Sequence, residues 1–120
     1  MNDKILSMSF LLDTNFIADC AKLGIDVRSE LMKFGKPVMF VMESSVAELR
    51  HKGLLTPLAA GIVRLCTTLP AKVGNVDKDL EIYAAEGYTV CTQDTRLRKR
   101  LHANGRKTVY IRQKRYLAAD

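Results

Sequence analysis

The sequence has no tryptophan, three cysteines and only two histidines among its 120 residues. Cys20, Cys66 and Cys91 lie far apart, and none belongs to a Cys-x-x-Cys pair or a zinc-binding pattern. Each cysteine lies in an apolar segment, which favours a buried free thiol. His51 and His102 are isolated among basic residues, which favours a surface position. These scarcities argue against a zinc site and against a catalytic site centred on histidine.

Long apolar runs are absent as well. No segment approaches the ~20 apolar residues that span a bilayer, and residues 1–10 lack the basic region and long apolar core of a secretory signal. Apolar residues make up 48% of the chain and charged residues 27%, as in an ordinary soluble globular protein. We therefore expect one domain, residues 1–120, in the cytoplasm and without membrane contact.

Acidic residues are scarce near the C-terminus. Residues 1–94 hold 10 Lys/Arg and 12 Asp/Glu, a net charge of −2, whereas residues 95–120 hold 9 Lys/Arg and only Asp120, a net charge of +8. The formal charge of the whole chain, +6, thus comes from this last segment. The asymmetry favours a polyanionic partner that docks there, although a solvated basic face would have the same composition.

The apolar pattern alternates between strand-like and helix-like segments. It predicts strands over residues 5–12, 37–43, 88–93 and 107–113. It predicts helices over residues 14–24, 26–35, 44–53, 56–69, 76–87 and 94–105. Short, wholly apolar strands that alternate with helices are typical of a parallel sheet buried on both faces. We expect an α/β protein, a three-layer α/β/α sandwich with a mostly parallel sheet of four to five strands.

Four acids fall where the carboxyl ends of these strands meet. Asp13 ends the first strand in "SFLLDTNFIADC", Glu48 lies in the helix after the second strand, Asp77 begins the helix before the third, and Asp94 follows the third. Each alone has a structural explanation: a helix N-cap, a capping box from Ser45 to Glu48, or a favourable helix dipole. Together, carboxylates crowded at one edge require protons or cations.

Hard divalent ions suit such a cluster, because Mg²⁺ or Mn²⁺ takes oxygen ligands. Asp13 would then bind the metal from a rigid strand end, and Thr14 and Asn15 would orient carboxylates or contact a phosphate. An acidic metal site beside a basic segment favours a phosphodiester substrate. The metal would activate water and stabilise the leaving oxygen.

The segments "FLLDTNFI", "SSVAEL" and "VDKDLEIYAAEGYTVCTQD" resemble, in order and spacing, the acidic motifs of PIN-domain ribonucleases, over roughly residues 8–115. The basic ending "CTQDTRLRKRLHANGRKTVYIRQKRYL" is similar to the branch that contains the ribosomal-RNA-processing nucleases of the small-subunit processome and their archaeal relatives. The resemblance implies a PIN-like fold and a Mg²⁺- or Mn²⁺-dependent endoribonuclease.

The family's catalytic and metal-binding acids correspond to Asp13, Glu48, Asp77 and Asp94. Asp79 is the alternative to Asp77, because the spacing from Asp77 to Asp94 is about one residue shorter than the family's pattern. Residues two apart on a helix point in different directions, so we expect only one of the two to face the metal, and we favour Asp77. Thr92 matches the family's small hydroxyl residue before the last acid, where it would contact a phosphate or a carboxylate. An ordinary strand residue is the alternative reading of Thr92.

Basic residues that follow Asp94 and the last strand are candidates to bind the RNA backbone. They are Arg96, Lys99, Arg100, Arg112, Lys114 and Arg115. Arg96 and Arg100 share a helix face, whereas Arg98 points elsewhere. The resemblance implies RNA as a partner and is compatible with a homodimer and with a ribosome-assembly or antitoxin partner.

Two alternatives to a ribosomal-RNA-processing nuclease remain open, and a third is disfavoured by Asn15. A VapC-type toxin would require an antitoxin that inhibits it. A non-catalytic RNA-binding PIN module would bind RNA with mutated acids as well as with intact ones. A haloacid-dehalogenase-like phosphatase would need an acid two residues after Asp13, where Asn15 stands.

Overall fold

The structure is a computed structural model that describes residues 7–120. These residues form one mixed sheet with the strand order β3-β2-β1-β4-β5-β6. Neighbouring strands from β3 to β5 run parallel, and β6 is antiparallel to β5. The strands are β1 (Ser7–Leu12), β2 (Lys36–Met42), β3 (Cys66–Leu69), β4 (Thr89–Cys91), β5 (Thr108–Arg112) and β6 (Tyr116–Ala119). The expected α/β/α class is confirmed, and the sheet has six strands instead of four or five.

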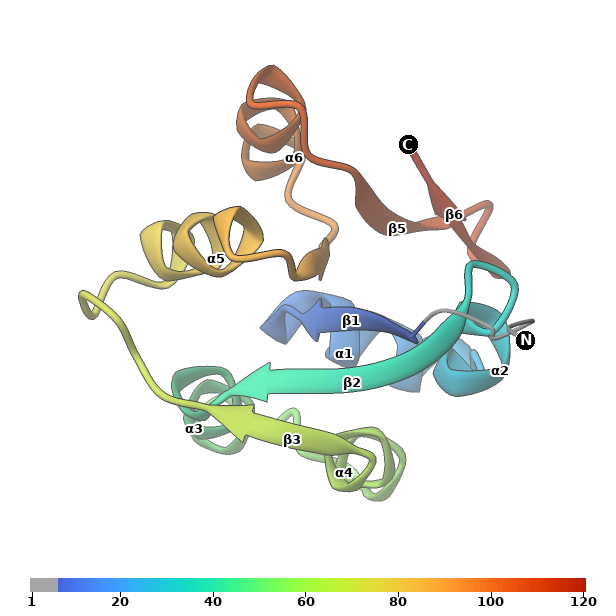
Figure 1. Ribbon diagram of the computed structural model, residues 1–120. Coiled ribbons are helices and arrows are strands. Elements are labelled where there is room, and N and C mark those ends of the chain that lie inside the picture. The colour runs from blue at the N-terminus through green and yellow to red at the C-terminus, as the bar shows by residue number, and fades with distance from the viewer. Residues whose placement is uncertain (1–6) are drawn as a thin grey trace.

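Helices cover both faces of this sheet, as Figure 1 shows. The helices are α1 (Thr14–Leu23), α2 (Val27–Leu31), α3 (Glu43–His51), α4 (Pro57–Arg64), α5 (Val76–Ala85) and α6 (Thr95–Ala103). Side chains of β1 alternate between two apolar cores. Phe10 and Leu12 pack with residues of α1 to α4, and Leu11 packs with residues of α5 and α6. This period of two is what a strand buried on both faces requires.

Two strands were not expected from the sequence. Cys66–Leu69 continues the apolar pattern of α4, but the helix ends at Arg64 and the next residues pair with β2 as an edge strand. β6 follows a turn whose residues Gln113 and Lys114 have φ of 53° and 56°. Asparagine or glycine is the usual occupant of such positions, so the hairpin carries no sequence signal.

The second predicted helix is shorter than expected. It ends at Leu31, and residues 32–35 form turns instead of continuing to Gly35. The Asp26 side chain caps the helix start by accepting a hydrogen bond from the Ser29 N–H. Within residues 7–120, no helix combines the length and apolar character needed to cross a membrane.

Candidate active site

Asp13 lies at the junction of β1 and α1, where it is buried with 9% of its surface exposed. Its backbone N–H donates to the Cys91 carbonyl, which extends the pairing of β1 with β4 by one residue (2.9 Å). Its Oδ1 accepts from the Thr14 N–H (2.8 Å), and its Oδ2 accepts from the Thr92 hydroxyl (2.9 Å). Each carboxylate oxygen therefore retains a lone pair for a further partner.

Burial raises the pKa of the Asp13 carboxyl above its ordinary value of 3.8. The hydrogen bonds from Thr92 and Thr14 lower this pKa, and the negative charges of Asp77 and Asp94 raise it again. The net increase means that ionised Asp13 is costly in the folded protein. A cation at this edge of the sheet would remove that cost.

Thr92, directly after β4, connects two of the predicted acids. Its buried hydroxyl donates to Asp13 Oδ2 and accepts from the Asp94 N–H (3.1 Å). Its own N–H donates to the Val109 carbonyl on β5 (2.9 Å), which holds the residue against the sheet. Thr92 thus makes a carboxylate contact, and fixes the position of one acid relative to the other.

Asp94 is the N-cap of α6. Its Oδ1 accepts from the backbone N–H groups of Arg96 and Leu97, at 2.9 and 3.1 Å. Asp13 likewise caps α1. Both acids therefore cap helices, which is the structural explanation that the sequence suggested for them. A functional role is compatible with capping, because Asp94 Oδ2 is not used by the cap.

Asp77 and Asp79, both in the first turn of α5, have different surroundings. Asp79 is 1% exposed and accepts from the backbone N–H groups of Lys72 and Val73, at 3.1 and 2.7 Å. These contacts close the loop between β3 and α5, and the bond from Val73 is the main cause of a lowered pKa at Asp79. Asp77 has a half-exposed side chain and lies near enough to Asp13 to raise its pKa.

Arg100 of α6 is the direct partner of Asp77. Its Nη2 lies 3.2 Å from Asp77 Oδ2, and its Nε lies 3.4 Å from Oε2 of Glu81 on α5. Sequence reasoning assigned Arg100 to RNA and did not find this contact, because the helices α5 and α6 meet only in the folded chain. A positive charge beside Asp77 offsets part of the crowding at this edge.

Glu48 on α3 makes an ion pair with Lys52 Nζ at 3.1 Å. Its pKa is lowered chiefly by the Thr14 hydroxyl, although no hydrogen bond of ordinary geometry joins the two groups. The predicted capping box between Ser45 and Glu48 is wrong, because α3 begins at Glu43 and its N-cap is Met42. Ser45 lies inside the helix instead.

The donors at this edge are carboxylate and hydroxyl oxygens, which fit a hard divalent cation. Within residues 7–120, however, no three acidic, histidine or cysteine side chains come close enough together to hold a metal ion. The hydroxyls of Thr14, Ser44 and Ser45 are buried, and none finds a hydrogen-bond partner in that range. Charge crowding at Asp13 and the unsatisfied hydroxyl of Thr14 beside it are what a cation with its waters would relieve.

Comparisons with known proteins agree with this arrangement at the level of fold. No protein-family model matches the chain, and no curated protein does. Among solved structures, that of the PIN domain endonuclease Utp24 matches with a TM-score of 0.75, covering 93% of this chain and 90% of that chain at 22% identity. The chain has the PIN-domain fold. The resemblance inferred from the acidic motifs is thereby confirmed for the architecture.

The basic residues expected to bind RNA lie in two parts of the fold, α6 and the β5–β6 turn. Arg96 and Lys99 are exposed on α6. The second group is exposed where β5 turns into β6, and consists of Arg112, Lys114 and Arg115. Arg98 instead pairs with Asp120 and lies over the ring of Tyr110, 3.8 Å from its centroid.

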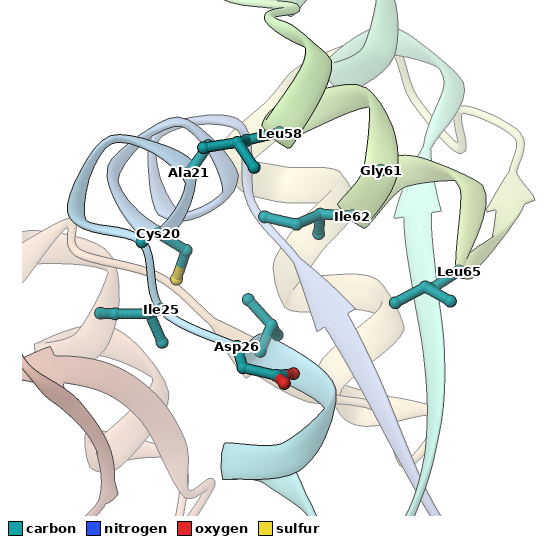
Figure 2. Close-up of a pocket in the computed structure, with 10 residues that line it drawn as sticks. Cys20, Ala21, Ile25, Asp26, Leu58, Gly61, Ile62 and Leu65 are labelled. Carbon is teal, nitrogen blue, oxygen red and sulfur yellow. The ribbon is translucent and has the colours of Figure 1, made fainter.

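A separate, mostly apolar pocket of ≈ 270 Å³ lies between the end of α1 and α4 in the PIN fold (Figure 2). None of the four acids lines it. Its thiol, Cys20, has a pKa raised to about 12 by burial, so it is not a nucleophile at neutral pH. Chemistry is therefore expected at the acidic edge and not in this pocket.

Gln93, between Thr92 and Asp94, was missed from the sequence. Its Oε1 accepts from the Ile111 N–H of β5 at 2.7 Å, which fixes the side chain beside the acidic edge. The signal that could have found it is the one that singled out its neighbours, a polar residue at the carboxyl end of a buried strand.

Proposed function

We propose that this chain is a metal-dependent endoribonuclease that hydrolyses phosphodiester bonds of RNA. The observation that supports it best is the Thr92 hydroxyl between two acids, with Asp77 close enough to raise the pKa of Asp13. Such crowding of carboxylates has a stability cost, and functional sites are where proteins retain that cost. The PIN fold of the endonuclease Utp24 is consistent with this proposal.

Asp13, Glu48, Asp77 and Asp94 would hold Mg²⁺ or Mn²⁺ together with water or the RNA phosphate, because no three such side chains of residues 7–120 lie close enough to hold the ion alone. The cation would supply Lewis acidity toward the phosphate and make water more acidic. Thr92 orients Asp13 through its hydroxyl, and the α1 cap at Thr14 N–H fixes the other oxygen. Arg100, which pairs with Asp77, would be free to contact a phosphate once the carboxylate binds a cation.

The substrate class follows from charge. The exposed cations of α6 and of the β5–β6 turn provide contacts to a phosphate backbone that are independent of sequence and sensitive to salt. The basic C-terminal segment favours precursor ribosomal RNA, on the resemblance to the processome branch of PIN nucleases.

The test begins with calorimetric titration of the chelator-treated protein with Mn²⁺, comparing wild type with Asp94→Asn. Asparagine caps helices as well as aspartate, so the variant should fold and yet lose Mn²⁺ binding. Asp13→Asn should reduce Mn²⁺-dependent cleavage of RNA by about 100-fold or more, since it removes a ligand rather than an orienting group.

The matched control is Asp26→Asn, which alters the cap of α2 at a distance from the four acids. It should retain both Mn²⁺ binding and cleavage. Undiminished cleavage by Asp13→Asn would remove that residue from the metal site.

A non-catalytic RNA-binding module is the second candidate. The observation in its favour is the Arg100 guanidinium, which already neutralises Asp77 without a metal. Such a module would bind RNA equally well with and without Asp13→Asn and would show no Mn²⁺-dependent cleavage.

A further inference from the structure

A groove of ≈ 540 Å³ runs beside the acidic edge, between α1 and the β5–β6 hairpin. Gln93 lines one end, directly before Asp94 in the chain, and Lys114 lines it from the hairpin. Asp19 and Lys22 line it from α1, and Asp19 follows Asp13 by less than two helical turns. None of the four acids lines the groove, but Gln93 places one part of it next to Asp94 in the chain.

The volume and the lining fit one nucleotide. Pockets for small ligands hold about 300–1,000 Å³ and combine apolar walls with a few placed polar groups. Leu23 and Ile111 supply apolar surface. Lys22 and Lys114 outweigh the one acid, Asp19, so the groove carries a net positive charge.

Gln93 lines the groove, and a hydrogen bond fixes the orientation of its side-chain amide. Its Oε1 must be the atom that accepts the Ile111 N–H, because only the oxygen of the amide can accept. The nitrogen Nε2 can then only donate. A base edge, which offers carbonyl and ring-nitrogen acceptors, is a suitable partner for such a donor.

Two residues of the β5–β6 turn have long side chains, although their backbone conformation favours glycine. Gln113 and Lys114 both have positive φ, and both line the groove. A non-glycine residue in this conformation strains the backbone. Two polar side chains that line a groove in spite of this backbone strain point to a ligand.

We propose that this groove binds the nucleotide next to the scissile phosphodiester of a single-stranded RNA. Lys22 and Lys114 contact phosphate oxygens, and Gln93 donates to an edge of the base. The inference rests on the proposed ribonuclease function, of which it names the substrate-binding subsite.

The test measures binding of a short, fluorescently labelled single-stranded RNA of mixed sequence to the full chain, by anisotropy in chelator at several salt concentrations. The groove variant is Lys22→Ala/Lys114→Gly. Glycine suits the positive φ at position 114, so the melting temperature should not fall. Affinity should fall roughly tenfold, and the slope of log K against log salt should decrease by about 1.4, because each single-strand phosphate contact contributes about 0.7.

The matched control, Arg28→Ala/Lys36→Ala, removes the same charge from a different groove, at the start of β2. It should leave the affinity and the slope close to those of wild type. Three outcomes would each overturn the inference. The two variants could lose equal RNA affinity, the groove variant could bind RNA as tightly as wild type does, or wild type could fail to bind RNA. Groove-dependent binding without Mn²⁺-dependent cleavage would instead overturn the proposed nuclease function and leave the RNA site in place.

Discussion

At the scale of single residues, Asp13 has opposite roles in stability and in the proposed activity. Its raised pKa means that the ionised carboxylate destabilises the fold, and its position makes it the central metal ligand of the proposal. Asp13→Asn should therefore raise the melting temperature in chelator while abolishing cleavage.

The difference in melting temperature between Asp13→Asn and wild type should depend on pH. Below the ordinary pKa of 3.8 the carboxyl is protonated in both the folded and unfolded states, so wild type and Asp13→Asn should melt alike. Above that value the unfolded chain ionises first, and the difference should grow until the pH passes the raised pKa of the folded state. Thermal melts across this range measure it, and a difference that shrinks with rising pH would contradict the assignment.

Thr92 offers a second prediction at this scale. Thr92→Val keeps the shape of the side chain but leaves Asp13 Oδ2 and the Asp94 N–H without their partner. Removal of such an orienting hydroxyl typically costs 10–100-fold in metal affinity or activity, and ~1–3 kcal/mol of stability for the buried groups left unpaired. Thr92→Ser, which keeps the hydroxyl, should retain most of the activity. If Thr92→Val cleaves RNA as fast as wild type does, Thr92 has no role in the site and is an ordinary strand residue.

At the scale of elements, α5 carries two acids with separate tasks. Asp79→Asn weakens the closure of the β3–α5 loop and should lower the melting temperature, with a smaller effect on cleavage. Asp77→Asn should do the reverse, because its half-exposed side chain makes only surface ion pairs. Thermal melts and cleavage rates for both variants test this assignment, and exchanged phenotypes would make Asp79 the third acid.

The helices and strands also show how much of the fold the sequence predicts. The placement of Asp13 and Asp94 near strand ends followed from the sequence, because buried apolar residues end β1 at Leu12 and β4 at Cys91 and polar residues follow. β3 could not be read in the same way, since its pairing with β2 overrides an apolar run that continues from α4. β6 depends on a turn with Gln113 and Lys114 at positive φ, which only the surrounding fold explains.

The same limit applies to the candidate site. The placement of the four acids at one edge followed from the expectation of a parallel sheet, whereas the strand order was not predicted. The Arg100–Asp77 pair and the Lys72 and Val73 bonds to Asp79 depend on how α5 docks, which no local pattern encodes. Gln93 is an intermediate case, a strand-end residue whose role depends on β5.

At the scale of the whole molecule, the net charge of +6 predicts RNA binding that weakens steeply with salt. Arg96→Ala/Lys99→Ala removes two exposed cations of α6 and should lower the single-strand salt slope by about 1.4. Arg100→Ala should change the slope less in chelator, because that guanidinium is held by Asp77 and Glu81. An unchanged slope in the double variant would exclude this face of α6 from the RNA path.

The hydrogen bond between Thr92 and Asp13 joins residues 79 apart in the chain. Contacts of such long separation form late, because a long loop must close before the contact stabilises it. A chain that folds as it is synthesised therefore completes the acidic edge only after β4 has emerged. If the proposed nuclease function holds, this order of assembly keeps the acidic edge incomplete near the ribosome's RNA until most of the domain exists.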